Sequence, residues 1–162
     1  MPKWGYSIAE GELDPEKTVK ASGRELRVSH KSAREVCKTV KGMMLIQAKR
    51  YLRDVIAKRR PVPFTRFKRK AGHRHGLEKA YAGRYPMKVA KYILKILEGA
   101  GANAEYKGLD SDRLCIIHAS AYPGMRIRRI MPRAFGRSSP KIKTLCHIEV
   151  VLQEQSETKE EL

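Results

Sequence analysis

Three stretches of the chain place apolar residues with the period of an amphipathic helix. The first predicted helix has one apolar face with positions spaced i, i+3, i+4 and i+7: Ala33, Val36, Cys37 and Val40. Ser29 and Ser32 are both candidates for its N-cap, and Ser32 with Glu35 also fits a capping box. The pattern predicts that this helix ends at Gly42.

The other two helices follow the same logic. Residues 44–60 predict a second helix, which Pro61 and Pro63 stop. Its inward-facing positions are Leu45, Ala48, Leu52, Val55 and Ile56. Pro86 suits the first turn of a third helix, and Gly108 is its candidate C-cap. The apolar face of the third helix comprises Ala90, Ile93, Leu94, Leu97, Gly101 and Ala104.

Strand-like segments flank these helices. Residues 18–28 predict a short strand or an extended lead-in, and residues 114–122 and 142–152 predict two further strands. The connection between the last two, residues 123–141, is too long for a tight hairpin turn. Two interpretations remain open for it: a flexible basic loop, or strands that continue as a ribbon tapering near residues 132–136. Ten residues of ribbon would reach about 33 Å.

The chain length of 162 residues suits one domain. Within it we expect a polar N-terminal arm at residues 1–17 and a long basic loop at residues 61–85. Residues 113–153 would form the strands and the connection between them, followed by an acidic tail at residues 154–162. A loop as long as the basic one is usually either functional or disordered.

Charge indicates the kind of partner. The net charge is +18, and residues 17–153 hold 33 Lys and Arg against 9 acids, so this part carries 33 − 9 = +24. From Arg113 to Ile148 there is no acid, and five arginines lie between Arg126 and Arg137. Such a basic surface is typical of nucleic-acid binding. An anionic membrane is the weaker alternative, since no segment resembles a signal peptide or a long apolar span.

Catalytic chemistry is not indicated. The sequence has no Gly-rich nucleotide loop, no recognisable nucleophile and base set, and no acid cluster that would hold metal ions for a nuclease. Cys115 with His118, and Cys146 with His147, suggest zinc, but adjacent strand residues point to opposite faces. Buried, reduced thiols are therefore the better interpretation, and we expect no metal and no cofactor.

Four motifs resemble the universal large-subunit ribosomal protein 22 family, called protein 17 in eukaryotes. They are Arg128-Arg-Ile-Met-Pro-Arg-Ala-Phe-Gly-Arg137, Lys143-Thr-Leu-Cys-His-Ile-Glu-Val-Val, Ser29-His-Lys-Ser-Ala-Arg-Glu-Val-Cys37 and Ala82-Gly-Arg-Tyr-Pro-Met-Lys-Val-Ala90. Together they cover most of residues 18–152 in order. The basic loop and the early arm resemble the archaeal and eukaryotic branch, and the modest length favours an archaeal member.

The resemblance implies an α+β fold: three helices packed on a small antiparallel sheet, with a long projecting β-hairpin. It implies a structural, non-catalytic protein that binds large-subunit rRNA and supports assembly in the cytoplasmic ribosome. Its partners would be rRNA, neighbouring ribosomal proteins and the nascent polypeptide. Membrane insertion and homo-oligomerisation are not expected.

The candidate residues fall into two groups. The predicted rRNA-binding residues are Lys31, Arg34, Lys38, Arg59, Arg60, Arg66, Lys68, Arg69, Lys70, His73, Arg74, Arg84, Lys88, Arg126, Arg128, Arg129, Arg133, Arg137, Lys141 and Lys143. The resemblance makes the hairpin tip part of the wall of the peptide exit tunnel, through Arg128, Arg129, Ile130, Met131, Pro132, Arg133, Ala134, Phe135 and Gly136. Phe64 and Phe67, which lie among cations of the basic loop, have a composition suited to base stacking.

Two other classes of function remain as alternatives. A nucleic-acid-binding regulator or chromatin protein would bind duplexes reversibly and would need a dimer face, for which the sequence offers no candidate. A basic enzyme acting on RNA would need a titratable pair at one place.

Overall fold

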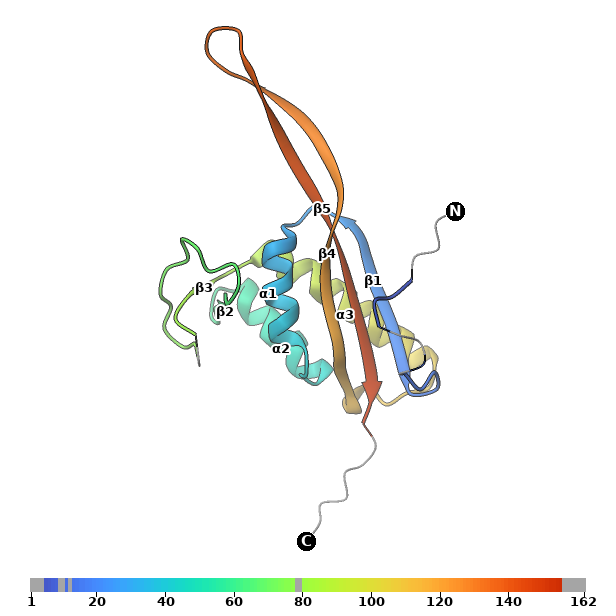
Figure 1. The fold of residues 1–162 in the computed structure, drawn as a ribbon. Helices are drawn as coiled ribbons and strands as arrows, with labels where there is room; N and C mark the ends of the chain where they lie inside the picture. The colour runs from blue at the N-terminus through green and yellow to red at the C-terminus, as the bar shows by residue number, and fades with distance from the viewer. Residues whose placement is uncertain (1–4, 9–10, 12, 78–79, 156–162) are drawn as a thin grey trace.

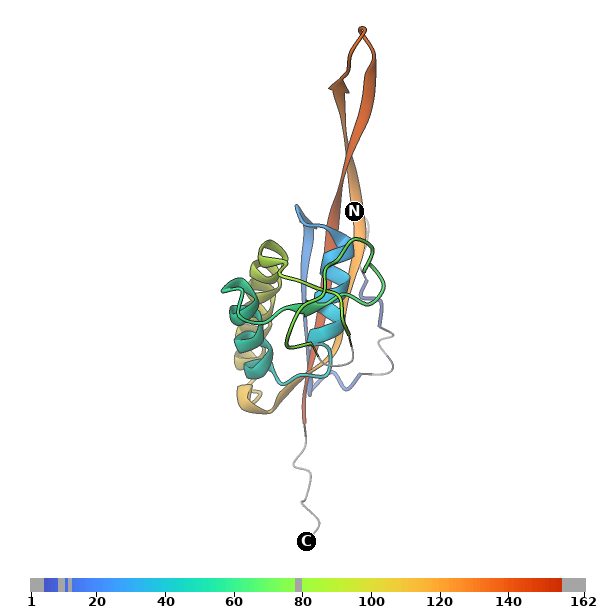
Figure 2. The ribbon, with the colours of Figure 1, turned by 90° about the vertical axis from the view of Figure 1, so that its left-hand side faces the viewer.

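The computed structural model describes residues 5–8, 11, 13–77 and 80–155. Helices and a small sheet form a body from which one hairpin projects (Figures 1 and 2). The helices are α1 (His30–Val40), α2 (Leu45–Ile56) and α3 (Met87–Tyr106). The strands of the main sheet are β1 (Thr18–Leu26), β4 (Leu114–Pro132) and β5 (Ser138–Glu154). The α+β prediction with a long hairpin is therefore confirmed.

The sheet is antiparallel and has the order β1-β5-β4, so β5 lies at its centre. Apolar side chains at alternate positions of β5 belong to the core that the helices cover: Cys146, Ile148, Val150 and Leu152. His147, Glu149 and Val151 alternate with them and are also buried. The central strand is thus buried on both faces along this stretch.

The first helix starts one turn earlier than a capping box at Ser32 would allow. Its N-cap is Ser29, in extended conformation, and its side chain makes no capping hydrogen bond. Ser32 lies inside the helix, so the predicted capping box is wrong. Glu35 cannot reach back to the helix start because its carboxylate is engaged by the basic loop.

The second helix ends at Ile56, four residues before the predicted end at Arg60. Lys58 has a φ of 60°, and the backbone N–H of Arg59 donates to the carbonyl of Asp54. A residue in the left-handed region ends a helix. Residues 57–60 therefore form a turn, and Arg59 and Arg60 project from it and not from a helix face.

The third helix ends as predicted. Gly108 has a φ of 75° and its N–H donates to Glu105, while the N–H of Leu109 donates to Ala104. This pair of hydrogen bonds is the Schellman motif, which favours glycine at the left-handed position. A short 3-10 turn, η2 (Ser111–Arg113), then leads into β4.

The open question about residues 123–141 is answered in favour of a ribbon. β4 and β5 stay paired out to Pro132 and Ser138, and only residues 133–137 form the loop at the apex. The N–H of Arg133 donates to the carbonyl of Arg137 and closes that loop. The ribbon extends well beyond the helices (Figure 1).

The basic loop is closed at its base by a two-residue ladder between β2 (Val62–Pro63) and β3 (Gly83–Arg84). At the C-terminus, Glu154 ends β5, and residues 156–162 of the predicted acidic tail lie outside the described residues. In the described part of the chain no helix is long and apolar enough to cross a membrane.

Where the hairpin leaves the body, backbone and side chain approach closely. The pairing of β4 with β5 shifts between Pro123 and Arg126, and His147 packs against Gly124 in this irregular stretch. His147 is only 7% exposed, and its Nδ1 accepts a hydrogen bond from the backbone N–H of Glu25. A Cβ on Gly124 would lie 2.7 Å from His147 Nε2. This glycine therefore lets the hairpin root pack onto the sheet.

We expect Gly124→Ala to lower the free energy of unfolding by about 1–3 kcal/mol, because His147 would have to move and its buried hydrogen bond would weaken. Urea denaturation measures this. Gly99→Ala is the matched control: a Cβ there meets nothing within 4 Å on helix α3, so stability should rise by about 0.5–1 kcal/mol. Equal stability for both variants would contradict the close packing of His147.

Candidate nucleic-acid interface

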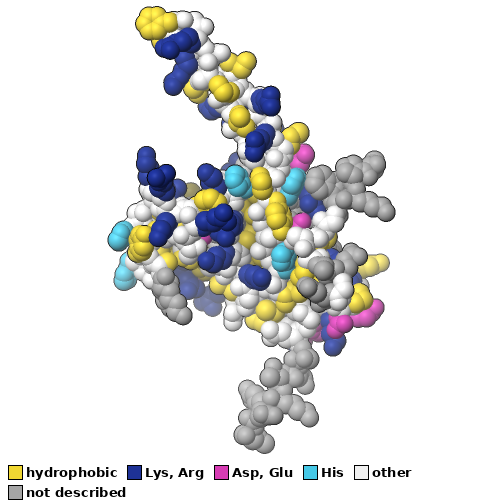
Figure 3. Space-filling model, viewed as in Figure 1, with side chains coloured by type: hydrophobic (Ala, Val, Ile, Leu, Met, Phe, Trp, Pro, Cys, Tyr) yellow, Lys and Arg dark blue, Asp and Glu magenta, His cyan; other side chains and the backbone are white. Residues whose placement is uncertain are grey.

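The predicted RNA-binding cations lie on the outside of the molecule. Nineteen of the 20 predicted residues are exposed, and Arg34 is half-buried. In Figure 3 the Lys and Arg side chains gather around α1 and the basic loop and continue along the hairpin. The structure therefore brings three predicted groups of cations, on α1, the basic loop and the hairpin, to one side of the body and its extension.

Strand register distributes the hairpin cations over both faces of the ribbon. Alternate residues of one strand share a face, so Arg126 and Arg128 lie on one face of the ribbon; directly paired residues of the two strands also share a face. Arg129 pairs with Lys141 and Ile127 with Lys143, which puts these cations on the other face. In the described part of the chain no ion pair involves these hairpin cations. The ribbon can therefore contact polyanions on two sides.

A single buried carboxylate orders the start of the basic loop. The side chain of Glu35, on α1, has no exposed surface. One of its oxygens accepts hydrogen bonds from the backbone N–H groups of Arg66 and Phe67, each at 3.0 Å. The other accepts from the backbone N–H and the hydroxyl of Thr65, each at 3.1 Å. Three consecutive backbone amides thus converge on one anion.

These hydrogen bonds decide the charge state of Glu35. Burial by itself raises the pKa of the carboxyl group, but the hydrogen bonds from residues 65–67 favour the anion and lower the pKa below its usual value of 4.5. The anion also lies 3.7 Å from Arg34 Nη1. The carboxylate is therefore ionised at neutral pH and holds the loop against α1.

The two phenylalanines of the loop anchor it, which corrects the base-stacking hypothesis. Phe64 is 3% exposed and belongs to the core, with the Arg84 guanidinium 5.6 Å from its ring centroid. Phe67 packs against the core and has Lys31 at 5.7 Å and Arg66 at 5.7 Å from its ring. Phe64 is therefore enclosed in the core, and Phe67 is half-buried against it, because the amides of residues 65–67 bind Glu35 and hold this segment on the helix.

The far end of the loop is fastened by cations. Arg84 donates to the carbonyl oxygens of Arg69 and Lys70. Lys68 lies over the ring of Tyr81 and Arg74 over that of Tyr85. These contacts order the loop and leave its Lys and Arg side chains at the surface.

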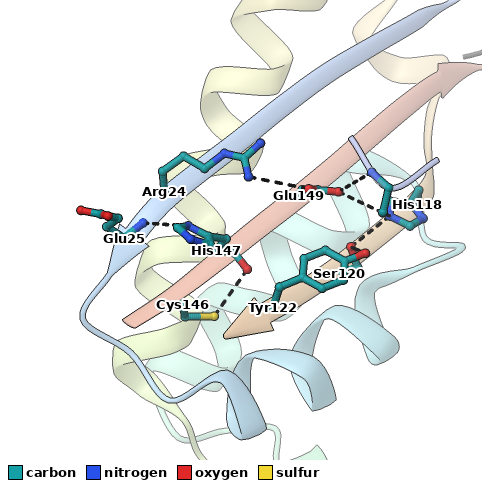
Figure 4. A network of polar contacts seen from close by, with 9 residues as sticks. Arg24, Glu25, His118, Ser120, Tyr122, Cys146, His147 and Glu149 are labelled. Carbon is teal, nitrogen blue, oxygen red and sulfur yellow. Dashed lines mark hydrogen bonds and ion pairs between the residues drawn. The ribbon is translucent and has the colours of Figure 1, made fainter. Parts of the chain in front are cut away.

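A second buried carboxylate fixes the N-terminal arm to the sheet face opposite the helices (Figure 4). Glu149 is 3% exposed and accepts from both the backbone N–H and the hydroxyl of Ser7. Its other oxygen lies 3.8 Å from Arg24 Nη1. His118 Nε2 lies 3.0 Å from the hydroxyls of Ser7 and Ser120, and burial, followed by the charge of Lys41, lowers its pKa.

Sequence reasoning missed the role of both anchoring acids: it placed Glu35 in a capping box and assigned no role to Glu149. A single acid within an otherwise apolar or basic pattern, as at Glu35 and Glu149, was the available signal. The thiols behave as predicted: Cys37, Cys115 and Cys146 are free and buried. Burial raises the pKa of Cys37 to about 12 and that of Cys146 to about 11. Among the described residues no three His, Cys, Asp or Glu side chains gather as a metal site would require.

Comparison with known proteins shows the family to which this chain belongs. Residues 21–153 match the model of the family described as ribosomal protein L22p/L17e. The chain belongs to the ribosomal protein L22p/L17e family. This confirms the resemblance seen in the motifs and makes the chain a structural, non-catalytic protein of the large ribosomal subunit.

Individual members of the family are similar over almost their whole length. The large ribosomal subunit protein uL22 of Methanocaldococcus jannaschii is 53% identical over 154 residues, covering 95% of this chain and 97% of the relative. That of Methanopyrus kandleri is 52% identical, covering 96% and 100%. That of Archaeoglobus fulgidus is 47% identical, covering 94% and 99%. All three relatives are archaeal, which agrees with the prediction of an archaeal member.

We expect Glu35→Gln to lower the free energy of unfolding by about 2–3 kcal/mol, because an amide replaces an anion that accepts four hydrogen bonds. Its NH₂ group would also face backbone donors. Trypsin should then cleave at Arg66 to Lys70 much faster than in the parent protein, while urea denaturation gives the stability change. Glu105→Gln, at an exposed position of α3, is the control and should change stability by less than about 0.5 kcal/mol.

The effect should depend on pH in a defined direction. Because folding lowers the pKa of Glu35, its ionised form stabilises the native state above pH 4.5, and this contribution is lost as the pH falls further. The stability difference between the parent protein and Glu35→Gln should therefore shrink below pH 4.5. A difference that stays constant down to pH 3 would show that the carboxylate is not the anchor.

Proposed function

We propose that the protein binds large-subunit rRNA through three basic surfaces: the exposed side of α1, the basic loop and both faces of the hairpin. The observation that carries this proposal is the distribution of the 20 predicted residues: 19 are exposed, and within the described part of the chain those on the hairpin form no ion pair with an acid. Phosphate groups of RNA are the dense anions that such surfaces fit. The proposed contacts are the 20 rRNA-binding residues predicted from the sequence, the first of which is Lys31 and the last Lys143.

The hairpin has a second role in this proposal. A narrow ribbon that is basic on both faces can pass between RNA segments and hold them together. At its apex Phe135 is 93% exposed with a φ of 58°, and Ile130 is 77% exposed. Apolar side chains displayed beyond the cations suit a surface that faces a passing polypeptide. We therefore place the tip, residues 128–136, in the wall of the nascent-peptide exit tunnel.

The partners follow from this placement. They are rRNA, neighbouring ribosomal proteins and, at the tip, the nascent polypeptide in the cytoplasm. In this proposal the protein acts as a single domain and does not form homo-oligomers. The hypotheses of a regulator and of an RNA-modifying enzyme are not supported by membership of a structural ribosomal family.

Replacing Lys31, Arg34 and Lys38 with Gln tests the α1 surface. Each lost phosphate contact reduces the slope of log affinity against log salt by about 0.9, so the slope should flatten by up to about three. Filter binding to a large-subunit rRNA transcript at several salt concentrations measures it. The matched control replaces Arg50, Lys91 and Lys95, three exposed cations outside the predicted set, with Gln. An unchanged slope in the first variant would mean that the α1 cations are merely solvated.

Shortening the hairpin tests its tip. Arg129 and Lys141 are directly paired, so Asn-Gly can replace residues 130–140 and close the ribbon there. We expect subunits to assemble in an archaeal host, because most proposed phosphate contacts remain, whereas nascent-chain stalling and sensitivity to tunnel-blocking drugs should change. Sucrose gradients and stalling reporters measure the two effects.

The double variant Arg133→Gln with Arg137→Gln keeps the full-length hairpin and removes only two positive charges of its tip. It therefore distinguishes the effect of losing these charges from the effect of losing the tip surface. Fewer assembled subunits, with normal stalling in those that form, would show that the tip is an RNA clamp like the rest of the hairpin.

A further inference from the structure

A groove lies where the hairpin meets the body. It has a volume of about 940 Å³ and is bounded by the chain before α1, the first turns of α1 and α3, and the hairpin from its root out to Arg129, where the proposed tip begins. In Figure 1 both helices begin at the end of the body from which the hairpin projects. Four separate segments of the chain therefore meet at this groove, which is as large as the roomiest small-molecule sites.

The lining of the groove is strongly positive. Five cations line it, one or two from each segment: Arg27, Lys31, Lys88, Arg129 and Lys143. None of the described residues that line it is acidic. Its apolar surface comes from Val28, Met87, Val89 and Leu145, among others. Arg27 lies outside every group of cations predicted from the sequence, because its neighbours in the chain show no basic pattern.

Two helix ends add to this positive field. α1 and α3 have 11 and 20 residues, and within the described part of the chain neither has a side-chain cap or an acid in its first turn. The backbone N–H groups at a helix start favour anions, and the aligned peptide dipoles strengthen the effect. Helix starts that open into a cationic groove without their own acids fit an anion supplied from outside.

We propose that this groove binds a stretch of the phosphodiester backbone of rRNA, with phosphates against the cations and helix starts and sugars on the apolar surface. The proposal rests on the proposed RNA-binding function and assigns it a defined seat, to which Arg27 contributes. RNA is favoured over an acidic protein segment because Lys141, the partner of the lining residue Arg129, extends the cationic lining outward along the same hairpin face, and Arg126 and Arg128 make the other face basic too, so a long polyanion can continue from the groove onto the ribbon.

The position of the groove gives it a mechanical role. Lys31 and Lys88 belong to the helical body, whereas Arg129 and Lys143 belong to the ribbon. An RNA strand held by both pairs would fix the angle between hairpin and body, since the ribbon itself is only two strands wide beyond this point. Binding in the groove would thus orient the hairpin as well as attach it.

Substitutions at the two helix starts test the groove without removing a core contact. Ser29→Asp with Met87→Glu introduces two negative charges into it, at positions where acids cap helices and favour their dipoles, so the melting temperature should not fall. Affinity for a large-subunit rRNA transcript at 0.15 M salt should drop at least about tenfold, with a smaller salt slope.

Two controls accompany this variant. Ser29→Asn with Met87→Gln has the same shape without the charge and should bind RNA about as well as the parent protein. Gln47→Glu with Ala102→Glu adds the same charge at exposed helix positions outside the groove, and should weaken binding less than about threefold because distant charges are screened.

Each outcome decides the proposal. A large loss confined to the acidic groove variant supports it. Equal affinities for the acidic and amide variants, or equal losses for the acidic groove variant and the distant pair, overturn it while RNA binding by the parent protein stands. If the parent protein itself shows no salt-dependent RNA binding, the proposed function fails first, and that result is visible without any variant.

Discussion

Like charges a few ångströms apart repel one another by about 1 kcal/mol in water, and residues 17–153 carry an excess of 33 − 9 = +24 positive charges. The architecture separates these charges from the core and from one another. The apolar core is enclosed by three helices and one sheet face, while the cations lie on exposed helix sides, a surface loop and a thin ribbon. A two-stranded ribbon lets both faces meet solvent or RNA, which spreads its arginines and lysines over two surfaces.

Two of the few acids in the body of the protein are buried and hold irregular segments of the chain in place. Glu35 gathers three consecutive amides of the basic loop, and Glu149 gathers the arm residue Ser7 on the opposite sheet face. Burying a carboxylate is costly unless hydrogen bonds replace its water. Because both groups are fully engaged, each converts an irregular segment into a positioned one. The basic loop is thereby ordered by contacts within the protein itself.

The root of the hairpin connects the body of the protein to the projecting ribbon. His147 packs against Gly124 and receives the N–H of Glu25, so the end of β1, the centre of β5 and the start of the projecting part of β4 meet at one residue. The groove lies in the same region, between this root and the first turns of α1 and α3. The direction of the ribbon is therefore set by this packing and, in our proposal, by bound RNA.

Helix periodicity, strand alternation and charge placed most of the architecture correctly. The faces of α1 and α3, the glycine end of α3 and the parts of β4 and β5 within the body were predictable because short-range spacing determines them, whereas the continuation of both strands into the ribbon was left open. Errors arose where a distant partner intervened. Glu35 fitted a local capping box but binds residues 65–67, and Phe64 and Phe67 fitted base stacking but pack inward beside α1.

The sequence by itself determined the kind of surface this protein presents, because charge and apolar period are properties of neighbouring residues. It also supplied the family, through motifs that keep their order along the chain. Only the tertiary structure decided which cations share a site. Arg27, Lys88 and Lys143 are far apart in sequence, and they line one groove because α1, α3 and the hairpin root converge there. Pairing across such distances depends on packing, which no local pattern encodes.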